Sequence, residues 1–292
     1  MLAGIQAQWR PLRAELFPQV VLLDLSDPQM LIGQAFKGGK PQGPTWSAPV
    51  PARTCKSGLP VALDALGDFI GDLLLEHSTP DAGLVVALPW ELGHWRVLDW
   101  PEGSTLEDPA EELRERRVDL GWPFSLDEAA LDVQPLAAAP GRSLVVGISH
   151  DALDSWIEVF AIAGGSLRHL IPAQACLHMA LQQELASSPP GALVALLQGS
   201  STANDLLVWR DGVPEFQRSL PRDQESLVPA LAQALGYCRS QLGGGAIRLL
   251  LDQPFEAAAA IRDQLGLELD VVDRGDYGSL HLAGLGLLEM AR

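Results

Sequence analysis

The segment 192–221 constrains the fold of this 292-residue chain more than any other segment. It opens with the apolar run 192–197, which favours a strand buried on both faces, and apolar residues resume at 206–209. The turn signal Arg210-Asp211-Gly212 and a further extended segment at 215–219 follow. The pattern predicts a three-stranded antiparallel meander whose first two strands form a β-hairpin.

The predicted hairpin tip consists of Gly199, Ser200, Ser201 and Thr202. Backbone N–H groups and hydroxyls that converge on one point can bind an anion such as a phosphate. The same residue types also dominate turns for purely conformational reasons. Their spacing alone leaves both interpretations open.

The composition excludes some functional classes. Hydrophobic residues make up 47% of the chain, which predicts a folded globular protein with a substantial core, in one large or two medium domains. The chain has 20 Lys and Arg residues against 37 Asp and Glu residues, a net charge of −17. This charge argues against broad contact with nucleic acid or anionic lipid and favours a basic or neutral partner.

Cysteine usage and hydropathy indicate a cytoplasmic protein. Cys55, Cys176 and Cys238 are far apart and lack histidines at ligand spacing, so we expect reduced thiols and no metal site. No apolar run has the length of a transmembrane helix, and residues 1–13 lack the apolar core of a signal peptide.

The first half of the chain begins with a second predicted hairpin. Its strands are expected at 19–25 and 30–36, and a Gly- and Pro-rich mobile loop is expected at 37–51. Apolar spacing predicts a helix at 60–77, and alternating charges predict a solvated helix at 108–121. Further strands are expected at 84–88, 95–100, 131–136 and 143–148.

Ser149, which stands where a predicted strand meets a helix, invites comparison with a hydrolase nucleophile. A nucleophile elbow needs the pattern G-x-S-x-G, and Asp151 stands in place of its second glycine. We instead expect Ser149 to cap a helix at 152–163, with Asp151 in the first turn of that helix. The sequence therefore offers no catalytic residue.

The second half again alternates helices with strands. Helices are expected at 173–187, 225–241, 256–265 and 282–291, and strands at 167–171, 247–251 and 267–272. A hairpin with a polar tip thus opens each half of the chain, and α/β alternation follows it. This order predicts an α/β protein with the two-lobed actin-like (ribonuclease H-like) fold and an α+β insert in the first lobe.

The expected divisions follow from this order. The first lobe would comprise 1–83, the α+β insert 84–166, the return to the first lobe 167–190, and the second lobe 191–292. The last helix is a candidate to pack back on the first lobe.

Within this fold the sequence resembles PilM, the cytoplasmic actin-like protein of type IV pilus assembly. The segments 122–128 and Asp132-Val133-Gln134 occupy the places of the family's I-P-F…E step and its D-Y/V-Q strand. The segment 153–159 is similar to the family's V-D-S-Y-V-E-V helix, and Gly164-Gly165 follows it. The resemblance covers nearly the whole chain and rests on the order and spacing of many weak motifs.

Departures from the family pattern bear on nucleotide binding. Relatives that bind nucleotide have tips similar to D-I-G-S and D-I-G-A-S-T-T, whereas Ser26 replaces the first glycine here and Leu197 replaces the second aspartate. Asp252-Gln253-Pro254 replaces the glycine pair of the base-binding loop, and Pro172-Ala173-Gln174 lacks the expected acidic residue.

The resemblance with these departures implies a degenerate member of the family, a pseudo-ATPase that needs no cofactor. If ATP with Mg²⁺ were bound, its contacts would be Asp24, Ser26, Gly199, Ser200, Ser201 and Thr202. No metal ligand set is expected otherwise.

The resemblance also implies partners. The expected partner is the cytoplasmic N-terminal tail of a PilN-type inner-membrane protein, docked near the insert, with further contacts to the pilus motor ATPases. The protein would then lie peripherally at the inner membrane, and its acidic charge fits a basic tail. Four tryptophans are either anchors for this tail or part of the core of the insert: Trp90, Trp95, Trp100 and Trp122.

Two other functions remain open at this point. The chain could be an active ATPase or a sugar-kinase-like enzyme of the same fold, because fold does not fix function. The altered tip residues argue against that. It could also be the cytoplasmic actin-like module of a type II secretion apparatus, although such a protein is expected to continue into a transmembrane helix beyond a residue such as Arg292.

Overall fold

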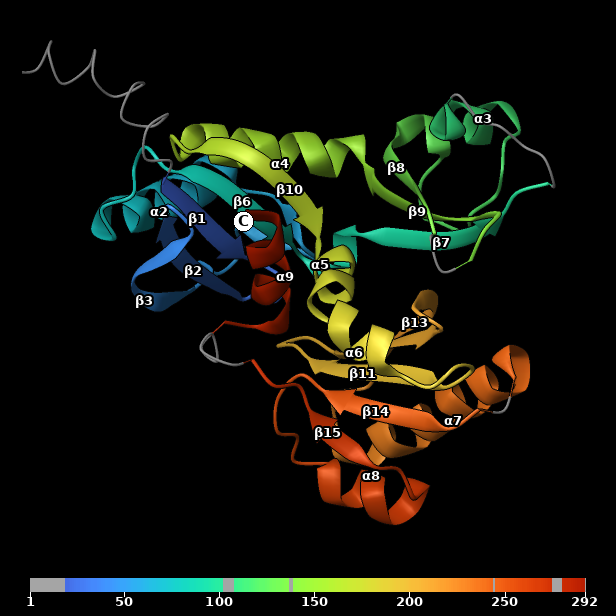
Figure 1. Cartoon of the computed structure of the whole chain (residues 1–292). Helices are drawn as coiled ribbons and strands as arrows, with labels where there is room; N and C mark the ends of the chain where they lie inside the picture. The colour runs from blue at the N-terminus through green and yellow to red at the C-terminus, as the bar shows by residue number, and fades with distance from the viewer. Residues whose placement is uncertain (1–18, 102–107, 137–138, 244, 275–279, 292) are drawn as a thin grey trace, which may run out of the picture. The chain divides into compact units, whose positions relative to one another are not determined.

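The computed structural model describes residues 19–101, 108–136, 139–243, 245–274 and 280–291 (Figure 1). The chain divides into two units. One unit is formed by Met1–Gly93, Ile148–Ala180 and Tyr277–Arg292, and the other by His94–Gly147 and Leu181–Asp276. We describe each unit by itself.

The first unit contains a five-stranded sheet in the order β10-β6-β1-β2-β3. β1 (Gln19–Asp24) is antiparallel to β2 (Met30–Lys37), which confirms the predicted hairpin. β1 is parallel to β6 (Gly83–Leu88), and β6 is parallel to β10 (Ser166–Pro172). The carboxyl ends of these three parallel strands therefore meet at one edge of the sheet, where the first polar tip follows β1.

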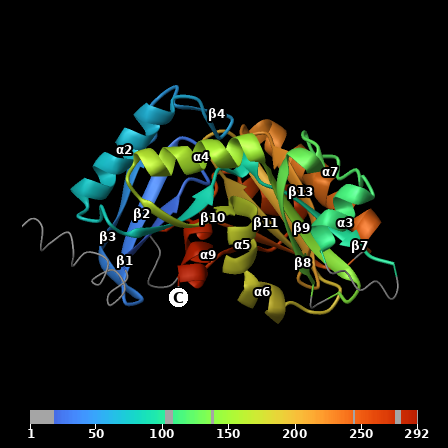
Figure 2. The same cartoon turned by 90° about the horizontal axis from the view of Figure 1, so that it is seen from above.

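Helices cover both faces of this sheet. α2 (Leu63–Glu76) and α4 (His150–Ile162) lie side by side on one face (Figure 2), where Ile70 and Trp156 join the core formed with Leu23. α5 (Ala173–Ala180) and α9 (Leu282–Ala291) pack together, and α9 contacts β1 and β6 from the other face (Figure 1). A two-stranded ribbon, β4 (Cys55–Lys56) with β5 (Leu59–Pro60), completes the unit.

Ser149 caps α4 as predicted. Its Oγ accepts a hydrogen bond from the backbone N–H of Ala152 at 3.3 Å, which satisfies one of the donors that a helix start leaves free. The glycine at the other end, Gly164, adopts a φ of 73° and ends the helix.

The prediction of a mobile loop at 37–51 is wrong. Most of this segment forms β3 (Lys40–Pro49), which pairs antiparallel with β2 at the edge of the sheet. Prolines signal a loop in a sequence, yet an edge strand tolerates them because one side of its backbone needs no partner. Trp46 supports the pairing: its indole lies over Gly33 of β2 and stacks on His77, with ring centroids 4.5 Å apart.

The second unit contains another five-stranded sheet, in the order β13-β12-β11-β14-β15. β11 (Leu193–Gly199), β12 (Asn204–Arg210) and β13 (Val213–Leu220) form the predicted meander. β14 (Ile247–Leu251) and β15 (Leu269–Val271) continue the sheet in parallel. α7 (Gln224–Leu242) and α8 (Ala258–Leu265) pack on one face, and α6 (Gln182–Ser187) is tied to β14 by an ion pair between Glu184 and Arg248.

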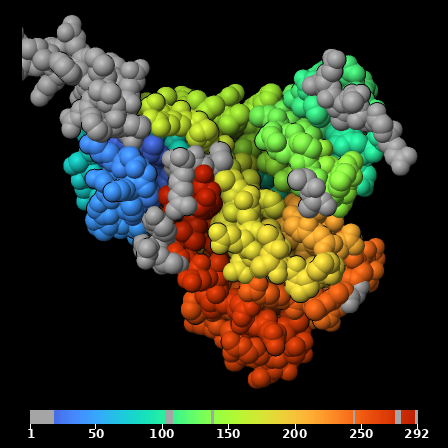
Figure 3. All heavy atoms as spheres, in the orientation of Figure 1, coloured from blue at the N-terminus to red at the C-terminus, as the bar shows by residue number. Residues whose placement is uncertain are grey.

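The insert is a three-stranded sheet in the order β7-β9-β8. It consists of β7 (His94–Asp99), β9 (Arg142–Ser149) and β8 (Ala129–Pro135), with α3 (Pro109–Glu115) beside it. Trp95 of β7 packs edge-on against Trp209 of β12, with ring centroids 6.4 Å apart, so the insert is anchored to the second sheet. Figure 3 shows the side chains of the insert, in green, at the molecular surface.

The structure differs from the predicted boundaries of the insert, 84–166. β6 pairs with β1 in the first sheet, and α4 packs on that sheet, so the insert proper is 94–147 and is grouped with the second unit. A short apolar run such as β6 carries no sign of the sheet to which it belongs, because every buried parallel strand has the same pattern.

Two predicted helices are shorter than expected. The charged helix at 108–121 stops at Glu115, because Arg117 takes a left-handed conformation with a φ of 51°. The helix expected at 173–187 is interrupted at Leu181, which separates α5 from α6. No Gly or Pro stands at that position to signal the break.

None of the helices in the described ranges is both long enough and apolar enough to span a bilayer.

Candidate functional site

The first predicted tip is held by hydrogen bonds within its own unit. Asp24 ends β1 and is buried, and its Oδ1 accepts the backbone N–H of Ser26 at 2.9 Å. Its Oδ2 accepts the backbone N–H of Gly284, in the first turn of α9, at 3.0 Å. Both carboxylate oxygens of Asp24 are therefore used inside the protein.

The residues beside this tip are also committed to packing. Gln174, at the start of α5, is buried, and its Nε2 donates to the backbone oxygens of Trp90 and Gly93, each at 2.8 Å. Ser26 is buried as well, and its Oγ has no hydrogen-bond partner among the described residues. The amide that stands where the family has an acidic residue thus fixes the chain that leads out of β6.

The second predicted tip forms a self-contained turn. Ser200 Oγ accepts the backbone N–H of Ala203 at 3.1 Å, and Ser200 N donates to the Ala203 oxygen at 2.9 Å. The backbone oxygen of Ser201 accepts a hydrogen bond from the guanidinium of Arg222 at 2.6 Å, and Thr202 lies in the same turn. These contacts give the hydroxyls of the tip a conformational role.

The loop after β14 lies over the glycine of this tip. A Cβ at Gly199 would stand 3.0 Å from Cζ of Phe255 and 3.4 Å from Nε2 of Gln253. A phosphate would need this glycine for close approach to the backbone, and Phe255 occupies the space beside it. Sequence analysis singled out Gln253 but neither Phe255 nor Arg222, because a lone aromatic or basic residue carries no motif.

The six predicted nucleotide contacts belong to two units. Asp24 and Ser26 lie in the first unit, and 199–202 lie in the second, so each half is known by itself. Within the described ranges no group of three His, Cys, Asp or Glu side chains is arranged to hold a metal ion.

The four candidate tryptophans have different environments. Trp90 and Trp95 are only 8% and 5% exposed, which supports the interpretation of these two as core. Trp100 is partly buried, and its Nε1 donates to Ser143 Oγ at 2.8 Å. Trp122 is also partly buried, and its ring lies directly over Gly147 of β9, where a larger residue would collide with it.

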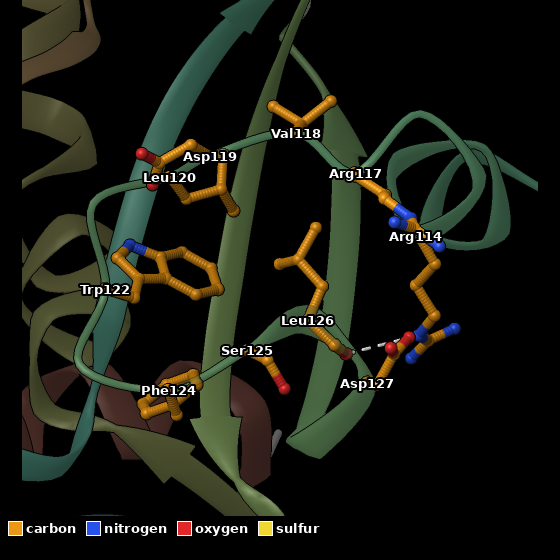
Figure 4. Close-up of a pocket in the computed structure, with 10 residues that line it drawn as sticks. All are labelled: Arg114, Arg117, Val118, Asp119, Leu120, Trp122, Phe124, Ser125, Leu126 and Asp127. Atoms are coloured by element: carbon orange, nitrogen blue, oxygen red, sulfur yellow. Dashed lines mark hydrogen bonds between the residues drawn. The ribbon is translucent and has the colours of Figure 1, made fainter.

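Trp122 forms part of a pocket of about 370 Å³ in the insert (Figure 4). The pocket lies where the chain from 117 to 127 curves over the sheet, and its apolar wall comprises Val118, Leu120, Trp122, Phe124 and Leu126. Its remaining lining residues are polar or charged: Arg114, Arg117, Asp119, Ser125 and Asp127. A preformed hollow of this size with an apolar wall suits one large side chain of a partner.

Local interactions hold this wall in place. A capping box between Ser125 and Glu128 shapes the short helix Leu126–Glu128. The ring of Phe124 lies 5.7 Å from Trp122 and 5.1 Å from His94, measured between ring centroids. Burial, and then the positive charge of Arg96, lowers the pKa of His94, so its imidazole is predominantly neutral at pH 7.

The charges at the rim are unevenly satisfied. Arg114 donates to the backbone oxygens of Leu126 and Ala129, each at 3.3 Å, and pairs with Glu111. Arg117 is exposed, and none of the described carboxylates pairs with it. Sequence analysis treated the charges at 111–117 as one solvated face, so it missed this arginine.

Comparisons with known proteins follow the fold. No family model matches the sequence, and no curated protein matches it. The chain aligns with a chain of the "PilM-PilN type IV pilus biogenesis complex" at a TM-score of 0.74 and 19% identity, over 93% of this chain and 98% of that chain. The chain has the actin-like fold.

Two further structures support this assignment of the fold. A protein of actin-like ATPase fold and unknown function from Bacteroides thetaiotaomicron aligns at a TM-score of 0.58 and 11% identity, over 93% of this chain and 95% of that one. The cytoplasmic domain of EpsL, an inner membrane component of the type II secretion system of Vibrio cholerae, aligns at 0.55 and 15% identity, over 94% of each chain. The predicted resemblance to PilM is thus confirmed as a similarity of fold.

Proposed function

We propose that this protein is a cytoplasmic adaptor of type IV pilus assembly. It binds the cytoplasmic tail of a PilN-type inner-membrane protein, is held at the inner membrane through that tail, and links it to the pilus motor ATPases. The observation that carries the proposal is the alignment with the PilM–PilN complex, which spans 98% of the other chain at a TM-score of 0.74. The insert, with its preformed pocket, supplies a surface for the tail.

We propose further that the adaptor works without nucleotide. The residues at the two tips do not fit Mg²⁺ and a polyphosphate, because both oxygens of Asp24 already accept hydrogen bonds from backbone N–H groups. Leu197, with a fully buried apolar side chain, stands at the position of the family's second aspartate. Phe255 adds a steric barrier beside Gly199.

A type II secretion module is the second candidate, because the cytoplasmic domain of EpsL also shares the fold. Its TM-score of 0.55 against 0.74 for the pilus complex favours the pilus function. An active actin-like ATPase is disfavoured by the same tip contacts that argue against nucleotide.

Calorimetric titration of the full chain tests the adaptor function. The titrant is a synthetic peptide that copies the cytoplasmic tail of the PilN-type protein from the same genome, with a scrambled peptide as control. Micromolar binding of the native tail alone supports the proposal. Absence of binding, or equal binding of the tail of the corresponding type II secretion protein, contradicts it.

A further inference from the structure

We propose that the pocket of the insert is the anchor site for the partner's tail, and that it takes a large apolar side chain whose neighbour in the tail carries a carboxylate. The carboxylate pairs with Arg117. This inference rests on the proposed adaptor function and adds the chemistry of the tail segment that is recognised.

The apolar half of the inference comes from the wall of the pocket. Leu120 and Leu126 are buried, whereas Val118, Trp122 and Phe124 stay partly exposed towards the hollow (Figure 4). The support beneath Trp122 is rigid, because Gly147 brings the β9 backbone directly under the indole. A rigid aromatic and aliphatic hollow gains affinity by desolvating one large apolar side chain at little cost in its own entropy.

The charged half comes from the arginines at the end of α3. Arg116 pairs with Glu112, and Arg114 is engaged by Glu111 and two backbone oxygens. Arg117 keeps its guanidinium exposed on the same side of the pocket as Arg114 (Figure 4). A third arginine, Arg96, donates to the backbone oxygen of Leu120 at 2.9 Å on the wall of the same pocket.

These arginines reverse the local charge of an acidic protein. The net charge of −17 favours a basic partner as a whole, yet Arg96, Arg114 and Arg117 lie around a pocket whose carboxylates are Asp119 and Asp127. Asp119 is partly used, because its Oδ1 accepts the backbone N–H of Gly121 at 2.8 Å. The guanidinium fork of Arg117 matches the geometry of a carboxylate, and no described group competes for it.

The first test removes the charge at the rim. Titrations of the full chain with the tail peptide compare wild type, Arg117→Gln and the control Arg116→Gln, whose arginine pairs outside the pocket. We expect Arg117→Gln to weaken binding by about three- to tenfold and Arg116→Gln to leave it unchanged. Changing the acidic residue of the tail to its amide is expected to weaken wild type equally and to have no further effect on Arg117→Gln.

The second test fills the pocket. Val118→Trp places a large side chain in the hollow, and we expect at least about tenfold weaker binding of the tail. Circular dichroism and the urea midpoint verify that this variant is folded. A tail variant in which the apolar anchor is changed to Ala should bind wild type and Val118→Trp equally weakly.

The outcomes separate this inference from the adaptor function. If wild type binds the tail but Arg117→Gln, Arg116→Gln and a folded Val118→Trp bind it with the same affinity, the tail docks elsewhere and the inference is wrong. If the tail that binds has no carboxylate beside an apolar residue, the inference is also wrong. If wild type does not bind the tail at all, both the adaptor function and the inference fail.

Discussion

The carboxylate of Asp24 accepts a hydrogen bond from the backbone N–H of Gly284, 260 residues further along the chain. Gly284 lies in the first turn of α9, so Asp24 satisfies a donor that the start of a helix leaves without an intrahelical acceptor. Its negative charge also opposes the positive end of the helix dipole. A residue that the resemblance to PilM assigns to nucleotide contact therefore holds the last helix on the first strand.

Replacement of this carboxylate should destabilise the first unit. Asp24→Asn puts an N–H₂ group against one of two backbone donors, so we expect the free energy of unfolding to fall by about 1–3 kcal/mol. Urea denaturation followed by circular dichroism measures it. The control Asp68→Asn, on the exposed side of α2, should change the free energy by less than about 0.5 kcal/mol. Equal midpoints for the two variants would contradict the role of Asp24.

The contact between α5 and α9 depends on Gly286. A Cβ at this position would collide with the backbone of Cys176, so Gly286→Ala must push the two helices apart. We expect a loss of about 1–3 kcal/mol in the free energy of unfolding. Gly236, in α7, has open space around its Cα, and Gly236→Ala should instead stabilise the protein by about 1 kcal/mol. Thermal and urea unfolding of the pair check the opposite signs.

The insert is tied to the second sheet by Arg142 and Glu215. Nη1 and Nη2 of Arg142 donate to the two carboxylate oxygens of Glu215 at 2.8 and 3.1 Å. Arg142→Met leaves the nearly buried Glu215 carboxylate without this partner, and we expect a loss of about 2 kcal/mol in the free energy of unfolding. Arg116→Gln, which removes an exposed pair on α3, should cost less than about 0.5 kcal/mol. A similar loss in both variants would argue against the Arg142 link.

The stability of the protein should depend on His94 in mildly acidic solution. Burial, followed by the charge of Arg96, lowers the pKa of this histidine below its ordinary value in the folded protein. The unfolded chain therefore binds a proton more readily, so stability is full above the unfolded pKa and falls as pH drops towards the folded pKa. His178, whose pKa is also lowered by burial, acts in the same direction.

Urea midpoints measured from about pH 7.5 down to about pH 5.5 test this dependence. Wild type should lose stability over the range, and His94→Gln should lose less because only His178 remains. An identical slope for wild type and His94→Gln would show that His94 does not contribute.

Local signals in the sequence predict most strands and helices. The hairpins at 19–36 and 192–210, the cap at Ser149 and the helix α7 follow from apolar periodicity and turn chemistry, which are local properties. β3 was missed because its prolines and glycines give a loop signal, whereas its pairing with β2 and the cover by Trp46 are tertiary facts.

The candidate sites were predictable as residue types but not as environments. The sequence pointed to Asp24 and to Trp122, yet it gave no sign that Gly284 occupies the carboxylate of Asp24 or that Gly147 carries the ring of Trp122. These contacts join residues that are distant in sequence. Arg117 was missed because its neighbours Arg114 and Arg116 have helical partners, and only the left-handed turn at Arg117 separates it from them.

The most direct test of the account is calorimetric titration of the full chain with the PilN-type tail peptide, in the absence and presence of Mg²⁺-ATP. We predict micromolar binding of the tail with the same affinity in both conditions, and no heat from Mg²⁺-ATP alone. Tail binding that requires ATP, or clear binding of ATP that is lost when Thr202 is changed to a bulky residue, would contradict an adaptor that works without nucleotide.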